Sequence, residues 1–136
     1  MARFQWLFGA LVLTQAAHSV EEYTGELYRS FPPARFVSGL ISSNHERGFA
    51  IANIVIVVLG LWCALVPVAR RWPSAWAITV IWAAVELMNG LGHLLWSAYQ
   101  GGYTPGAATA PTQLIVSLLL IQELRRSGQS ASTSSS

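Results

Sequence analysis

Residues 49–68 read FAIANIVIVVLGLWCALVPV, twenty consecutive residues without a charged side chain. An α-helix needs about 20 predominantly apolar residues to cross the hydrocarbon core of a bilayer. Residues 73–99 form a second stretch of this kind and carry a single charge, Glu86. These two stretches predict transmembrane helices.

Two further apolar stretches flank this pair. Residues 104–122 are uncharged, although proline and glycine soften their start. Residues 4–23 lose their apolar character after Ala17, so a span there must include His18 and the polar residues that follow it. The sequence therefore predicts an all-α integral membrane bundle of four transmembrane helices, at about residues 4–23, 49–68, 73–99 and 104–122.

The first stretch has an alternative interpretation as a cleaved signal peptide. Arg3 would supply the basic n-region, residues 4–13 the apolar core, and Thr14 and Ala16 the flanks of a cleavage site. The match to that pattern is poor, and a first transmembrane helix is favoured.

Composition agrees with a membrane protein and excludes some functions. Charged residues make up 10% of the chain, against about 25% in a typical soluble domain. The net charge is +2 and the basic residues are scattered arginines, which excludes a nucleic-acid-binding surface. The lone cysteine, Cys63, cannot form an intramolecular disulfide. A composition rich in Ala and Arg and free of Lys indicates a bacterial source.

Arginines near the ends of spans indicate orientation, because cytoplasmic loops are enriched in basic residues. With four spans, the side that holds both termini carries Arg3, Arg70, Arg71, Arg125 and Arg126. The opposite side carries Arg29, Arg35 and Arg47. We expect both termini in the cytoplasm and the chain in the bacterial inner membrane.

The chain outside the spans divides into a loop and a tail. The loop at 24–48 has an apolar repeat, Phe36, Val37, Leu40 and Ile41, which favours a short helix lying on the membrane surface. An irregular loop remains the alternative. Residues 1–126 form one transmembrane domain, and the Ser-rich tail 127–136 is expected to be disordered.

Polar side chains interrupt the apolar stretches at similar depths. With a rise of about 1.5 Å per residue, His18 lies about 21 Å from the inner end of its span. Glu86 and His93 lie about 20 and 30 Å from the inner end of theirs. Gln113 falls about 14 Å below the outer end of the last span. All four side chains therefore share the middle-to-outer part of the membrane.

Helical periodicity places these residues on common faces. At about 100° per residue, Glu86, Asn89 and His93 form one stripe. A second stripe on the first span contains Thr14, Gln15, His18, Glu21 and Glu22. Neither stripe can face lipid without a large cost, so the two stripes should face each other.

Imidazoles and carboxylates gathered in this way are typical ligands of a divalent transition metal such as zinc, iron or manganese. They equally suit proton transfer between an acid and a base. The candidate metal ligands are His18, Glu21, Glu22, Glu86 and His93. The candidate catalytic groups are Glu86, Glu22 and His18; Asn89 and Gln113 would orient them, and His45 is a further candidate.

Several of these residues also have structural interpretations. Glu21 and Glu22 can lie in water at the interface, and Asn89 can bond one helix to another. His45 and Glu46 can flank the start of the second span. Glu86 is the hardest to explain structurally, because it lies near the centre of an apolar run.

Two short motifs resemble the signature of the HXXEE family, a group of small bacterial multi-pass membrane proteins of unknown function. They are His18-Ser19-Val20-Glu21-Glu22 and Asn89-Gly90-Leu91-Gly92-His93. The resemblance covers most of the chain and implies that His18, Glu21, Glu22, Asn89 and His93 form the defining site. Glu86 is added from its depth and face, not from the family.

Three functions fit the cluster. The favoured hypothesis is a membrane-embedded enzyme that uses a metal or acid–base site on a lipid-soluble small molecule. The second is a carrier for protons or metal ions, which would need to oligomerise because four spans enclose only a narrow path. The third is a non-catalytic membrane subunit whose polar cluster locks the helices together.

Overall fold

The computed structural model describes the backbone of residues 2–133 and the side chains of residues 2–127. This part of the chain is all-helical, with six α-helices and no strand. The α-helices are α1 (Arg3–Thr24), α2 (Leu27–Ser30), α3 (Pro32–Ile41), α4 (His45–Cys63), α5 (Ala75–Gln100) and α6 (Ala110–Thr133), and a π-helical turn, η1 (Ala64–Val68), continues α4.

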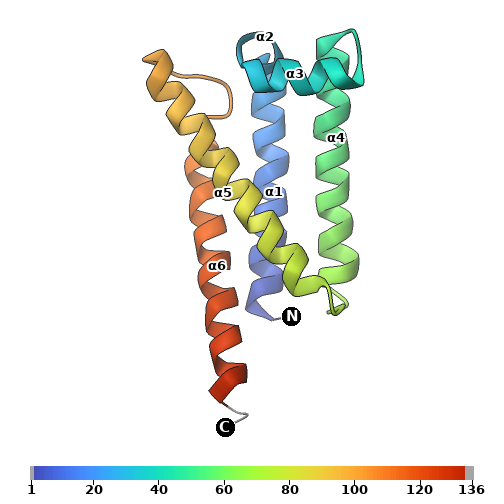
Figure 1. Ribbon diagram of the computed structural model, residues 1–136, viewed down its shortest axis with the longest axis vertical. Helices are drawn as coiled ribbons and strands as arrows, with labels where there is room; N and C mark the ends of the chain where they lie inside the picture. Colours follow the sequence, from blue (N-terminus) through green and yellow to red (C-terminus); the bar gives the residue numbers. More distant parts are fainter. Residues whose placement is uncertain (1, 134–136) are drawn as a thin grey trace.

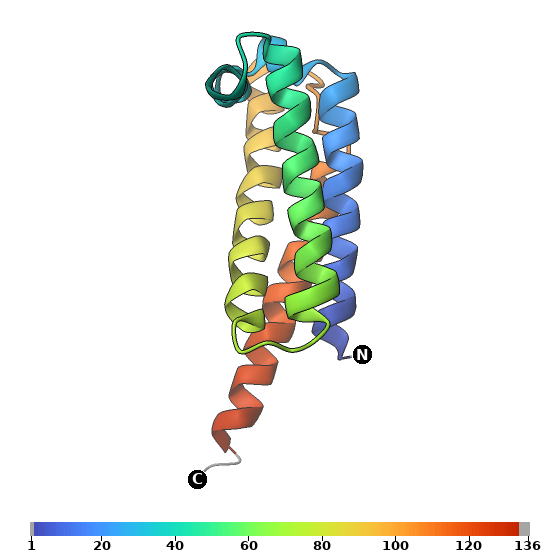
Figure 2. The same ribbon diagram turned by 90° about the vertical axis from the view of Figure 1, so that its right-hand side faces the viewer.

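Four long helices run along the molecule, and both termini lie at the same end (Figure 1). The short helices α2 and α3 cross the opposite end, over the end of α1 and the start of α4 (Figure 1). Turning the view by 90° brings α4 to the front, with α1 and α5 seen on either side behind it (Figure 2). The main contacts join α5 to α6, and α1 to both α6 and α4, whereas α4 and α5 share few contacts.

Two helices of the described chain are long and apolar enough to cross a membrane. They are the continuous α4–η1 segment, His45–Val68, and α5, Ala75–Gln100. The helices α1 and α6 do not reach the same apolarity, because α1 carries the polar stripe and α6 continues into the polar C-terminal sequence. Of the four predicted spans, the helices themselves are all present, and two meet the requirement for a membrane span.

The helix boundaries differ from the predicted ones mainly at the last helix. The helix predicted from residue 104 begins at Ala110, because Gly106 adopts a φ of 94° and breaks the helix before it. At its other end, the backbone of α6 continues to Thr133, and the disorder expected for the tail at 127–136 stays a prediction. Residues 134–136 of that tail lie outside the described part of the chain. The helix predicted in the first loop is present as α3.

Two apolar clusters hold the helices together, one toward each end. The larger lies at the end with the termini, where Phe8 meets Trp82 edge to face at a centroid distance of 6.3 Å. The smaller lies beneath α2 and α3 and contains Leu27, Tyr28, Ala34 and Phe49. The buried polar side chains Gln15, His18, Glu22, Glu86, His93 and Gln113 lie between the two clusters, whereas Gln5 and Thr79 lie at the end with the termini.

The helix α3 is held across the bundle by a close contact with α4. Pro32 at the first position of α3 suits a helix start, since its missing N–H needs no partner there. The Asn44 side chain caps α4 by accepting a hydrogen bond from the Arg47 backbone N–H at 3.0 Å. A Cβ atom at Gly48 would lie 2.1 Å from the Ser38 carbonyl oxygen, so only glycine permits this approach.

We predict that Gly48→Ala destabilises the fold by about 1–3 kcal/mol, because α3 must move away from α4 to admit the methyl group. The matched control is Gly92→Ala, where an added Cβ has no atom within 4 Å. That control should be neutral or stabilising, since alanine favours a helix more than glycine. Thermal unfolding in detergent compares the two, and equal midpoints would show that the α3–α4 contact is not needed.

Candidate metal site

Three buried side chains meet between α1 and α5. Glu22 Oε1 lies 2.9 Å from His93 Nε2 and 3.4 Å from His18 Nε2. The two imidazole rings stand edge to face, with their centroids 4.6 Å apart. The exposed fractions of His18, Glu22 and His93 are 0%, 7% and 2%. One ligand atom from each residue lies within 4.8 Å of the others, as metal coordination requires.

The hydrogen bonds on the far side of each ring determine which nitrogen faces Glu22. His93 Nδ1 lies 2.9 Å from the Pro105 carbonyl oxygen, which can only accept, so Nδ1 carries the proton. His18 Nδ1 lies 2.6 Å from Thr109 Oγ1, whose own proton goes to Glu21 Oε2 at 2.6 Å. His18 Nδ1 is therefore also a donor, and in the neutral rings both Nε2 atoms are acceptors.

Three acceptors consequently converge on one point. Glu22 Oε1 and the two Nε2 atoms all present lone pairs there, and His18 Nε2 has no hydrogen-bond partner among the described residues. Buried acceptors that face one another are costly unless a proton or a cation lies between them. Metal-binding histidines typically donate their second N–H to a carbonyl or a similar acceptor, as both rings do here.

Glu21, the fourth residue of the first motif, points away from this group. Its carboxylate accepts hydrogen bonds from the Ala108 and Thr109 backbone N–H groups at 3.0 and 2.9 Å, just before α6 begins. It also accepts from the hydroxyls of Thr109 and Tyr103. The bond to Glu21 raises the pKa of Tyr103 above its usual value. Glu21 thus joins α1 to the α5–α6 loop, and through Thr109 it holds His18.

Glu86 forms a separate buried group with two glutamines. Gln113 Nε2 donates to Glu86 and to Gln15 Oε1, the latter at 2.7 Å. Exchanging the oxygen and nitrogen of the Gln15 amide replaces this last bond, because the nitrogen then donates to Glu86 Oε2 at 2.6 Å. Asn89 lies within hydrogen-bonding reach of Glu86. The predicted orienting residues, Asn89 and Gln113, therefore hold Glu86 rather than the histidines.

His45 lies apart from both groups. It is exposed at the start of α4 and lines a polar hollow on the outer side of α2 and α3. The other residues of this hollow are Tyr28, Arg29, Arg35, Asn44 and Glu46. The structure does not bring His45 to the buried cluster.

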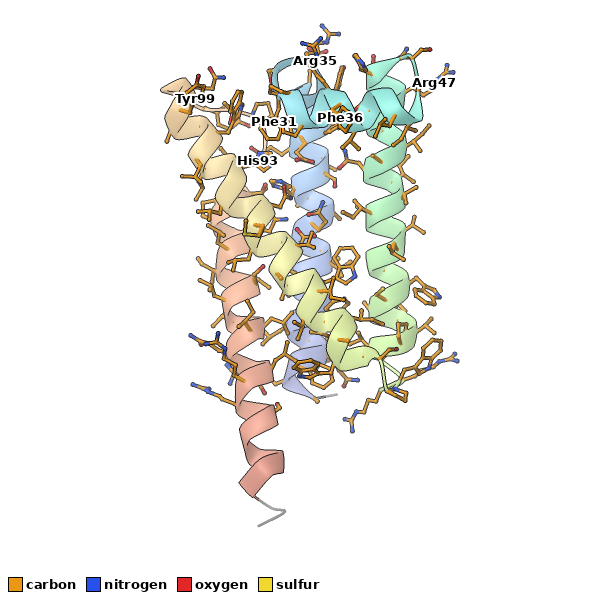
Figure 3. All side chains as sticks on the ribbon, viewed as in Figure 1. Phe31, Arg35, Phe36, Arg47, His93 and Tyr99 are labelled. Atoms are coloured by element: carbon orange, nitrogen blue, oxygen red, sulfur yellow. The ribbon has the colours of Figure 1, made fainter. Side chains whose placement is uncertain are left out.

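A cavity of about 330 Å³ connects the two buried groups. One wall is polar and carries Gln15, Glu22, Glu86, Asn89 and His93. The remaining walls are mainly apolar and come from α3, α4 and the segment before α3. Figure 3 shows His93 just beneath Phe31 at the end covered by α3, and the two rings lie 5.9 Å apart.

The α5–α6 loop supplies site residues that the sequence analysis missed. Pro105 and Thr109 fix the two imidazoles, and a Cβ at Gly106 would lie 2.3 Å from His93 Nδ1. Gly106 therefore leaves room for the His93 ring. The available signal was the cluster of glycine, proline and threonine between two apolar stretches, which marks a structured turn as readily as a soft helix start.

The fold and site define an all-α protein with a buried His/Glu cluster between its long helices. The family model described as "Protein of unknown function with HXXEE motif" matches residues 6–120. The chain therefore belongs to the HXXEE family, as its two motifs predict. Comparison with curated proteins gives no match, and comparison with solved structures gives none either.

We predict that Glu21→Gln destabilises the protein by about 1.5–3 kcal/mol, because an amide cannot replace a carboxylate that accepts four hydrogen bonds. The matched control is Glu26→Gln, which removes only an exposed ion pair with Arg29 and should cost less than about 1 kcal/mol. Denaturation monitored by circular dichroism measures both. Similar losses in the two variants would rule out the joining role of Glu21.

Proposed function

We propose that this protein is an integral membrane protein of the bacterial inner membrane in which His18, Glu22 and His93 bind one divalent transition metal. The metal site acts on a lipid-soluble molecule held in the adjoining cavity, with Glu86 as the acid–base group. The single observation that carries this proposal is the convergence of three buried acceptors on one point.

The distribution of apolar side chains supports four membrane spans. The helix α1 exposes Trp6, Leu13 and Val20 at 66%, 67% and 63%, while it buries His18 and Glu22. From Leu13 onward this arrangement is the reverse of a surface helix in a soluble protein, which buries its apolar face, whereas the first half of α1 buries Phe8, Leu11 and Val12. The other long helices expose large apolar side chains too, among them Ile54, Val58, Leu65, Ile81, Met88, Leu95, Ile115 and Leu118. Apolar surface of this extent is typical of contact with lipid.

The surface of α3 supports a position at the membrane interface. The helix lies across the ends of the long helices (Figure 1), and its Phe36, Val37, Leu40 and Ile41 side chains are exposed. A short amphipathic helix of this kind lies in the plane of the membrane surface. With both termini in the cytoplasm, α3 covers the outer end of the bundle, and the metal site lies in the outer half.

Two histidines and one glutamate are the ligand set of several catalytic zinc sites, in which the fourth position stays open for water or substrate. Ligand atoms at about 2.0–2.2 Å from a tetrahedral ion lie about 3.4 Å apart, close to the separation of Glu22 from His18. Zinc, iron and manganese all accept such ligands. A bound ion would polarise a carbonyl group or activate a water molecule beside the cavity.

Glu86 supplies the second chemical group. Its carboxyl is 1% exposed, faces the same cavity as Glu22 and His93, and is held by Gln113. A carboxyl held in place beside a substrate can take up a proton or return one, which is what isomerisation, cyclisation and hydrolysis all need. A carrier for protons or metal ions fits less well, because Phe8, Leu11, Val12, Trp82 and Leu120 close the bundle on the cytoplasmic side.

We predict about one transition-metal ion per chain in detergent-purified protein, measured by elemental analysis. The double variant His18→Ala/His93→Ala should lose the ion, because one carboxylate alone cannot hold it. The matched control is His45→Ala, which removes an exposed histidine outside the cluster and should keep the ion. The metal proposal fails if the double variant retains the same metal, or if wild-type protein takes up none of zinc, iron, manganese or cobalt.

We further predict that Glu22 is needed for metal affinity and that Glu86 is not. Glu22→Gln should weaken metal affinity at least about tenfold, since even residues that merely support a ligand have effects of that size. Glu86→Gln should leave the affinity within about twofold, because Glu86 lies outside the group of ligand atoms. Competition with a chromogenic chelator gives both affinities. A large loss with Glu86→Gln would instead make Glu86 a ligand.

A further inference from the structure

We infer that the cavity beside the metal site takes an uncharged, single-chain amphiphile. Its hydrogen-bonding head would lie against the polar wall, and its alkyl tail would lie among the apolar side chains. This inference rests on the proposed function and names the class of its substrate.

The shape of the cavity suits one chain with one polar end. All of its charged and imidazole groups lie on one wall, from α1 and α5. The facing surface is apolar and is formed chiefly by Phe31, Val37, Phe49, Ala52 and Ile56. At about 330 Å³ the cavity is at the small end of the range for ligand sites, which favours a single chain over a two-chain lipid.

The charges on the polar wall favour an uncharged head. The residues that line the cavity include two carboxylates, Glu22 and Glu86, and no arginine, and the chain contains no lysine. The two positive charges of a divalent ion balance these two carboxylates. An anionic head would then be buried without a cationic side chain to pair with it, which is costly. A cationic head would compete with the metal for the same carboxylates.

Hydrogen-bonding groups for an uncharged head are present on the same walls. Asn89 on α5 and Asn53 on α4 line the cavity and offer amide donors and acceptors. An alcohol, ester, amide or aldehyde can bond to such groups without bringing a charge into the bundle. These are also the functional groups that a metal ion and a carboxyl group can transform.

The arginines of this end of the protein lie elsewhere. Arg29 and Arg35 line the polar hollow on the outer side of α2 and α3, together with His45. An anionic lipid head would therefore be attracted to the outer hollow and not to the reactive cavity.

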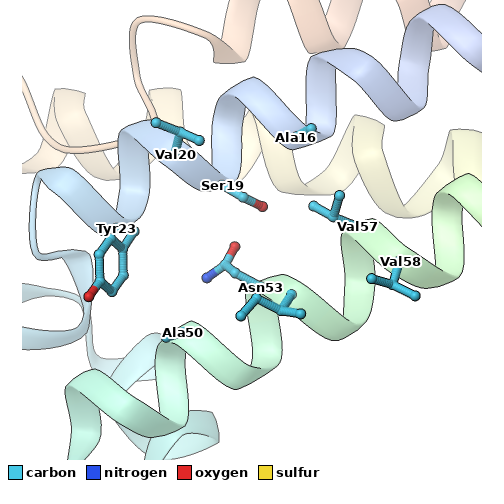
Figure 4. Close-up of a pocket in the computed structure, with 9 residues that line it drawn as sticks. Ala16, Ser19, Val20, Tyr23, Ala50, Asn53, Val57 and Val58 are labelled. Atoms are coloured by element: carbon cyan, nitrogen blue, oxygen red, sulfur yellow. The ribbon is translucent and has the colours of Figure 1, made fainter.

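A groove on the outside of the bundle offers the tail a way to the lipid. It lies between α1 and α4, has a volume of about 510 Å³ and is mainly apolar. Figure 4 shows Ser19 and Asn53 facing each other across this groove. Asn53 also lines the reactive cavity, so the groove and the cavity meet at that residue. A molecule dissolved in the bilayer can reach the site sideways, without passing through water.

Photolabelling in lipid nanodiscs tests the inference with three matched probes. They are decanol, decyl sulfonate and decyl ammonium, each carrying a diazirine on the chain, used on protein loaded with Co²⁺. We expect decanol to label peptides that contain the cavity residues Ile56 and Val85 at least about tenfold more than the charged probes do. Ala52→Trp should abolish this labelling by filling the cavity, whereas Ile51→Trp, on the exposed side of α4, should not.

The Co²⁺ absorption spectrum distinguishes a failure of the proposed metal site from a failure of the inference about the cavity ligand. It reports the metal site directly, and it also shows whether Ala52→Trp has kept its fold; Val85→Phe replaces that variant if it has not. Labelling of the cavity by the sulfonate or the ammonium probe as strong as by decanol overturns the inference. So does the absence of cavity labelling by decanol while the Co²⁺ spectrum is intact. A wild-type protein that binds no Co²⁺ contradicts the proposed function, and the ranking of the three probes still decides the choice of head group.

Discussion

A glutamate placed between two imidazoles in the buried interior of the bundle is the constraint on which the rest of the site depends. Glu22 approaches Nε2 of both His18 and His93, and every group around these rings is arranged to keep those two nitrogens directed at it. In a medium of low dielectric constant such an arrangement is stable only when its charge is balanced locally. The nearest arginines lie outside the cavity, so the balance must come from a proton or a cation.

The α5–α6 loop is built to serve this arrangement. It passes close over the His93 ring at Gly106, donates backbone N–H groups to Glu21, and ends in the first turn of α6. A carboxylate at that point also suits the positive end of the helix dipole. The residues of the first motif therefore have two roles. His18 and Glu22, four residues apart, form part of the buried cluster, while Glu21 bonds to the α5–α6 loop that supports the cluster.

Helix geometry alone explains how much of the site the sequence could predict. Fixed rise and fixed rotation per residue place His18, Glu22, Glu86, His93 and Gln113 in one layer whatever the details of packing, and these side chains do share the buried interior. The direction of Glu21 and the roles of Pro105 and Thr109 were out of reach, because a loop takes its conformation from contacts with distant residues. The separation of Glu86 from the histidines depends likewise on Gln15 and Gln113, which meet only in the folded bundle.

The same geometry explains why α1 looks unlike a membrane span when its hydropathy is averaged. Most of its polar residues lie on the buried side, together with Phe8, Leu11 and Val12, and its exposed side carries Trp6, Leu13 and Val20. The average therefore hides a helix whose exposed side is mainly apolar. The polar part of this interior gains little from forming in water, where His18 and Glu22 would lose hydration and the exposed Leu13 and Val20 would gain none of the benefit of burial. In lipid the same arrangement is favoured, because polar stripes that faced the hydrocarbon would be costly and so face each other. The proposed metal site and the proposed membrane location are therefore linked: surroundings that make an apolar exterior favourable would also bring Glu22 and the two histidines together.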